Sequence, residues 1–96
     1  MGEFGRTPKV NGGNGRDHWT RAFGAALAGA GIAGGRAVGR TNGLGTEAVE
    51  RPVSVQDLFA TIYDRLGVDA SKKYVSQAGR PVKILDGGEP VKELLS

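Results

Sequence analysis

The pattern of apolar and polar residues predicts one clear amphipathic helix, at about residues 55–66. Apolar side chains recur there every three or four positions, which places them on one face of the helix. This stripe predicts that the helix packs one side against other parts of the structure. It consists of Val55, Leu58, Phe59, Ile62 and Leu66.

Both ends of this helix carry residues that favour helix termini. Ser54 is a natural N-cap, and Asp57 stands at the third helical position, where its carboxylate can complete a capping box. Gly67 can adopt the left-handed conformation that ends many helices, and Val68 can then fold back over the last turn. The predicted helix therefore has a defined beginning and a defined end.

The rest of the pattern is weaker. Residues 22–28 form a compact apolar run bounded by glycine, which suits a buried strand, although periodicity alone leaves a helix open. Residues 82–85 predict a short strand and residues 91–95 a short tail helix. Residues 5–21 and 34–51 are rich in glycine and polar side chains, so we expect long loops there.

Composition predicts a thin core. Glycine accounts for 17 of the 96 residues, and 13 of these lie within the first 45. Leu, Ile, Val and Phe together number 22, whereas 11 of the hydrophobic residues are alanine. A chain of this length forms one small domain at most, and its few large side chains offset the entropy cost of folding poorly.

Charge and cysteine content exclude several classes of protein. A net charge of +3 is smaller than the positive charge that nucleic-acid-binding domains usually carry, so we expect no nucleic-acid partner. Without cysteine the chain has no disulfide framework and no thiolate zinc site. The longest uncharged run, at residues 22–35, is too short to cross about 30 Å of hydrocarbon, so we also expect no membrane partner.

Residues 29–34 match the G-x-G-x-x-G pattern of dinucleotide-binding loops. That function requires a helix to begin within the motif, but the residues after Gly34 include Gly35, Gly39 and Asn42-Gly43, which disfavour a helix. We therefore expect a backbone turn at this point and no nucleotide cofactor.

The densest cluster of reactive side chains is Arg16-Asp17-His18, which follows a glycine-rich loop. A neutral imidazole is a good ligand for divalent metal, and a neighbouring carboxylate can bind alongside it or orient it. The guanidinium of Arg16 suits phosphate or sulfate oxygens. The alternative is that His18 is a hydrogen-bonded structural residue, and one histidine cannot close a zinc site by itself.

The order of short motifs along nearly the whole chain resembles the sulfatase-like domain-of-unknown-function family 1501, a branch of the alkaline phosphatase superfamily. Each motif alone would be weak, but the set is specific. The motifs are Glu3-Phe4-Gly5-Arg6-Thr7-Pro8, Asn11-Gly12, Gly15-Arg16-Asp17-His18-Trp19, Leu27-Ala28-Gly29-Ala30-Gly31-Ile32, Gly34-Gly35, Arg51-Pro52-Val53, Asp57-Leu58-Phe59-Ala60-Thr61-Ile62, Leu66-Gly67, Gly79-Arg80-Pro81 and Leu85-Asp86-Gly87-Gly88.

The resemblance implies the fold. It makes the chain an α/β protein, the C-terminal portion of an alkaline-phosphatase-like three-layer α/β/α sandwich with long Gly-rich loops. Residues 1–96 would be one partial domain. Within it, residues 1–21 would form a metal- or anion-site loop, residues 22–51 a buried strand and loop, and residues 52–96 the helix, a short strand and the tail.

The resemblance also implies site residues and a cofactor. His18 would be a metal ligand together with Glu3, and the metal would be zinc, calcium or magnesium. Arg6, Arg16 and Asp17 would contact an anionic phosphate or sulfate ester. Phe4 stands where the wider superfamily has a histidine ligand, so this chain departs from the usual two-metal centre.

The superfamily places its nucleophile early in a much longer chain, so no catalytic nucleophile is expected here. We therefore expect a C-terminal fragment that is inactive alone, with Met1 as an internal methionine of a parent that is often exported. Its substrate would bind only when the missing N-terminal part completes the site. The apolar helix face and the exposed edge of a strand at residues 22–28 would favour self-association.

Two other hypotheses stay open. The chain could be a small stand-alone binding module without enzymatic activity that reuses the same fold layer. Nucleic-acid binding is the third. Dense arginine-glycine tracts with interleaved aromatics bind RNA, but the Gly-Arg pairs of this chain are scattered, which favours glycine turns with solvated arginines.

Overall fold

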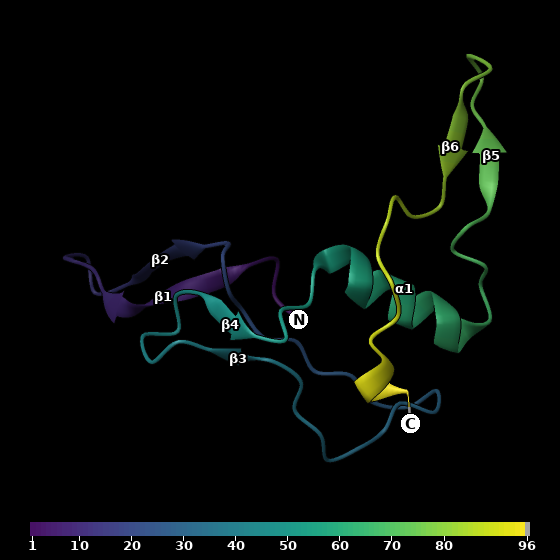
Figure 1. The fold of residues 1–96 in the computed structure, drawn as a ribbon. Coiled ribbons are helices and arrows are strands. Elements are labelled where there is room, and N and C mark those ends of the chain that lie inside the picture. Colours follow the sequence, from purple (N-terminus) through teal and green to yellow (C-terminus); the bar gives the residue numbers. More distant parts are fainter. Residues whose placement is uncertain (96) are drawn as a thin grey trace. The chain divides into compact units, whose positions relative to one another are not determined.

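A computed structural model describes residues 1–95 of the chain as short strands, one α-helix and extended connections (Figure 1). The elements in chain order are β1 (Gly5–Val10), β2 (Arg16–Trp19), β3 (Arg40–Thr41), β4 (Ala48–Glu50), α1 (Val55–Leu66), β5 (Lys73–Val75), β6 (Pro81–Lys83) and a 3₁₀ turn, η1 (Lys92–Leu94).

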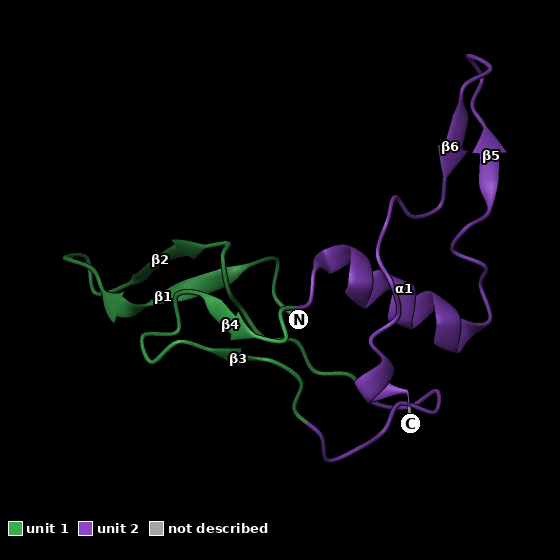
Figure 2. Cartoon of the chain, in the orientation of Figure 1, with its two compact units in different colours: residues 1–27, 37–52 green, residues 28–36, 53–96 purple. Residues whose placement is uncertain are grey.

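The chain divides into two compact units (Figure 2). Unit 1 contains residues 1–27 and 37–52, and unit 2 contains residues 28–36 and 53–96. Three antiparallel two-stranded sheets join β1 to β2, β3 to β4, and β5 to β6. The first two belong to unit 1, whereas unit 2 combines the β5–β6 hairpin with α1. The structure thus has mixed α/β content, as the sequence predicts.

Helix α1 has the predicted bounds and the predicted caps. The Ser54 hydroxyl accepts a hydrogen bond from the Asp57 N–H at 3.0 Å, and the Asp57 carboxylate accepts one from the Ser54 N–H at 3.1 Å. At the other end Gly67 has φ +77°, and the Val68 N–H donates to the Tyr63 carbonyl at 2.8 Å. The capping box and the left-handed glycine are both confirmed.

The centre of unit 2 is a contact between α1 and the C-terminal tail. Thr61 and Val91 are fully buried, and among residues 1–95 the only other buried residue is Ala60. The Thr61 hydroxyl donates to the Asp57 carbonyl and accepts the Val91 N–H, both at 2.8 Å. The Asp57 carboxylate also accepts the Glu89 N–H at 3.0 Å. The prediction of a thin core is confirmed.

The prediction that residues 5–21 are a loop is wrong, because they form the β1–β2 hairpin. Its pairing is irregular between Arg6 and Val10, where Pro8 has no N–H to donate to a partner strand. Most residues of β1 and β2 are polar or charged, so the hairpin lacks the alternating apolar pattern that usually marks strands in a sequence. Residues 34–51, also predicted as a loop, contain the very short strands β3 and β4.

The predicted buried strand at residues 22–28 is also wrong. The segment forms neither strand nor helix, and most of its residues are exposed. Its side chains are mainly alanine and glycine, which bury too little apolar area to hold a strand in a core. The strand edge from which we predicted self-association is therefore absent, whereas self-association itself stays a prediction.

The remaining expectations for local structure hold in part. Residues 29–34 contain a tight turn, in which the Ile32 N–H donates to the Gly29 carbonyl at 2.8 Å and Gly31 has φ +79°. The strand predicted at residues 82–85 appears as β6, shifted by one or two residues. The tail helix is reduced to the single turn η1. Within residues 1–95 no helix has the length and apolarity to span a membrane.

Replacing Thr61 by valine should lower the free energy of unfolding by about 1–3 kcal/mol, because the buried Val91 N–H loses its acceptor. Thr61→Ser keeps the hydroxyl and is the matched control. Urea unfolding followed by circular dichroism at 222 nm measures both. Equal stability of Thr61→Val and the native chain would contradict the role assigned to this hydrogen bond.

Replacing Gly67 by valine should destabilise the end of α1 by about 1–2 kcal/mol, because a side chain at φ +77° is strained. Gly34→Val is the control in the same unit, since Gly34 has neither a positive φ nor a neighbour within 4 Å of an added Cβ. The same unfolding experiment applies. A loss no greater than that of the control would show that this cap is dispensable.

Candidate functional site

The β1–β2 hairpin in unit 1 brings three of the predicted site residues onto one face. Arg6 and His18 are direct cross-strand partners, and such partners project from the same side of a sheet. Arg16 lies two residues before His18 on β2, so its side chain projects from that side as well. The face therefore carries an imidazole and two guanidinium groups.

Phe4 supports this face from the residue before β1. Its ring centroid lies 4.3 Å from that of His18, with the planes tilted by 46°. The Arg6 guanidinium carbon lies 5.4 Å from the same phenyl centroid. Phe4 cannot bind a metal, but it positions the imidazole and a guanidinium by ring contact and by a cation–π interaction.

The two arginines are held by backbone carbonyl groups. One Arg6 Nη donates to the Arg16 carbonyl at 3.4 Å, and the Arg16 Nε donates to the Thr7 carbonyl. Within residues 1–95 their side chains form no ion pair with a carboxylate. Most of their N–H donors therefore remain available for an anion.

Asp17 lies between Arg16 and His18 on β2, so it projects from the other side of the strand and does not join this face. Its carboxylate accepts the Asn11 side-chain N–H at 2.9 Å. The Asn11 carbonyl oxygen in turn accepts the N–H groups of Gly13 and Gly15, at 2.9 and 3.1 Å. In this structure Asp17 thus orders the glycine-rich loop between the strands.

Glu3 and His18 are the two predicted metal ligands, and both are exposed. Within residues 1–95 the Glu3 carboxylate has no hydrogen-bond or ion-pair partner, and neither ring nitrogen of His18 is hydrogen-bonded. No cluster of three or more metal-binding side chains occurs in that part of the chain. The structure therefore offers two free donor groups but not a closed metal site.

A second hairpin, β3–β4, is tied to the end of β2. The Trp19 indole N–H donates to the Thr46 carbonyl at 2.7 Å. The Asn42 side chain accepts the Thr46 N–H at 2.9 Å and holds the intervening turn closed. Arg21 adds an exposed ion pair with Glu47 at 3.5 Å and lies over the Trp19 ring. Trp19 is therefore an anchor for β2 rather than part of the reactive face.

The supporting roles of Phe4 and Trp19 were not predicted from the sequence. The signal for Phe4 was available, because in an extended chain it shares a face with Arg6 two residues later. The contact between Trp19 and Thr46 spans 27 residues, and no local pattern encodes it.

Residues 1–95 match the family model described as "Protein of unknown function (DUF1501)". The chain belongs to this family. No curated protein and no solved structure matches the chain. The resemblance seen in the motifs is thus confirmed for the family itself, whose description names no activity.

Replacing Gly5 by alanine should disrupt the face that carries His18. An added Cβ would lie 2.5 Å from the Ala22 carbonyl oxygen and 2.9 Å from that of Trp19, so the backbone would have to move. We expect a loss of about 1–3 kcal/mol in unit 1. The measurement is the strength of the nuclear Overhauser contact between the Phe4 and His18 rings.

Gly12→Ala is the control for this experiment, because an added Cβ at Gly12 meets no atom within 4 Å. The ring contact should weaken or vanish in Gly5→Ala and persist in Gly12→Ala. An unchanged contact in Gly5→Ala would show that Gly5 is not needed to position Phe4.

Proposed function

We propose that this chain contributes the face carrying His18 to a metal-dependent site that hydrolyses phosphate or sulfate esters. In this proposal it forms the C-terminal part of a sulfatase-like hydrolase of the alkaline phosphatase superfamily. The observation that carries the proposal is the cross-strand placement of Arg6 opposite His18, with Arg16 on the same side.

The residues fit the two tasks that such a site requires. An imidazole with two free nitrogens and an unpaired carboxylate are ligand types that zinc accepts, and the carboxylate also suits calcium or magnesium. Guanidinium groups bind the oxygens of phosphate and sulfate in a fork of N–H donors. When bound, the metal would activate the nucleophile and stabilise charge on the transferring group.

The chain's own residues have narrower roles in this proposal. His18 and Glu3 each donate one ligand atom, while Phe4 fixes the plane of the imidazole by ring contact. Arg6 and Arg16 hold the anionic oxygens of the ester. Asp17, which the resemblance suggested as a substrate contact, instead orders the loop through Asn11.

Two ligands do not complete a metal site, so we propose that further donors and the nucleophile come from polypeptide beyond residues 1–95. The distribution of apolar surface supports this view. Phe59, Leu66 and Val75 are 39%, 65% and 75% exposed, and only three described residues are buried. The larger sheet of an α/β/α sandwich would cover surfaces of this kind, and we propose that this is their role.

Metal titration of the 96-residue chain tests the ligand roles. Added Zn²⁺ should shift the ring resonances of His18 in a saturable way, and His18→Gln should weaken zinc binding at least tenfold. Glu3→Gln should weaken it several-fold. Glu89→Gln, which removes an exposed carboxylate from unit 2, is the matched control and should leave binding unchanged.

Zinc affinity that is unaffected by His18→Gln would overturn the proposed metal site. Turnover of p-nitrophenyl phosphate and p-nitrophenyl sulfate provides the second readout, and the chain alone should show none. Turnover that persists in His18→Ala would contradict the proposal as a whole.

A further inference from the structure

Unit 2 contains a cavity of about 530 Å³ that the proposed hydrolytic role does not use. Its apolar lining includes Ala60 from α1 and Val68 and Leu85 from the segments that flank the β5–β6 hairpin. Its charged lining includes Lys73 at the start of β5 and Lys83 at the end of β6. The volume is within the range of sites that hold small organic molecules.

The two lysines are direct cross-strand partners, so their side chains project from the same side of the hairpin. Like charges in this arrangement repel each other and destabilise the pairing of the strands. Within residues 1–95 neither ammonium group has an ion-pair or hydrogen-bond partner. An anion held between them would remove this repulsion.

Two carboxylates also line the cavity, but each already has a partner. Asp64 forms an ion pair with Arg65 at 2.9 Å. Asp69 accepts the hydroxyl of Ser71 at 2.6 Å and its backbone N–H at 2.9 Å, and these bonds lower the pKa of Asp69 below its usual 3.8. Because Ser71 is neutral, Asp69 keeps its negative charge. Among the charged side chains that line the cavity, only Lys73 and Lys83 have no hydrogen-bond or ion-pair partner within the described residues.

We propose that this cavity binds a small organic anion, with a phosphate or sulfate group between Lys73 and Lys83 and an apolar body against Ala60, Val68 and Leu85. The two ammonium groups can share one tetrahedral oxyanion, because long flexible stems carry both of them. All of these residues belong to unit 2, so the inference stands or falls independently of the metal site in unit 1.

Titration of the 96-residue chain with phenyl phosphate, phenyl sulfate and inorganic phosphate, followed by backbone amide shifts, tests the proposal. We expect saturable shifts around the cavity for the two phenyl esters and at least fivefold weaker binding of inorganic phosphate, which lacks the apolar body. Lys73→Gln and Lys83→Gln should each weaken binding of phenyl phosphate at least fivefold.

Lys92→Gln and Lys9→Gln remove the same charge elsewhere and should change binding less than twofold. Lys92 lies in η1 of unit 2 and does not line the cavity. Lys9 belongs to unit 1.

Three results would overturn the proposal. The first is that neither phenyl ester binds in a saturable way. The second is that all four variants lose binding equally. The third is that the backbone amide shifts are confined to unit 1. Because Lys73→Gln and Lys83→Gln relieve a like-charge contact, the hairpin should stay folded in both. Unchanged amide dispersion of the free variants checks this point.

Discussion

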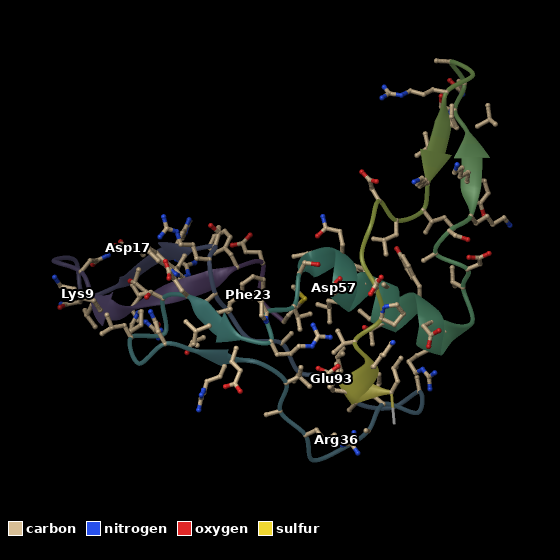
Figure 3. All side chains as sticks on the ribbon, viewed as in Figure 1. Lys9, Asp17, Phe23, Arg36, Asp57 and Glu93 are labelled. Atoms are coloured by element: carbon tan, nitrogen blue, oxygen red, sulfur yellow. The ribbon has the colours of Figure 1, made fainter. Side chains whose placement is uncertain are left out.

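The buried hydroxyl of Thr61 is the interaction on which unit 2 depends. It lies within α1 and accepts the N–H of Val91, so it satisfies a backbone group that has no access to water. The tail fixed in this way holds the segment 28–36, because the Ala33 N–H donates to the Leu94 carbonyl at 2.8 Å. Arg36 adds a bond to the Glu93 carbonyl at 3.0 Å (Figure 3).

In unit 1, hydrogen bonds from side chains to the backbone hold the segments together. Asn11 and Asn42 each close a turn, and Trp19 joins the two hairpins through its indole N–H. These polar contacts order the chain, and neither the imidazole nitrogens of His18 nor the carboxylate of Glu3 take part in them. The metal-binding role that we propose rests on this separation between residues that build the hairpin and residues that stay free.

Helix α1 could be predicted from the sequence to the residue, because its signals are local: a capping box, a 3.6-residue apolar period and a terminal glycine. The β1–β2 and β3–β4 hairpins could not be predicted, because their strands are mostly polar or only two or three residues long and leave no periodic pattern. The residues of the candidate site could be named from motifs. Their grouping on one face could not be predicted, because the pairing of Arg6 with His18 depends on the register between β1 and β2.

The central structural claim is that hydrogen bonds between α1 and the tail, rather than a large apolar core, organise unit 2. Native-state hydrogen exchange measures this directly. The account predicts that the Val91 amide is protected as strongly as the central amides of α1, and that Thr61→Val removes the protection of Val91 first. Exchange of the Val91 amide at the rate of an unprotected peptide in the native chain would contradict it.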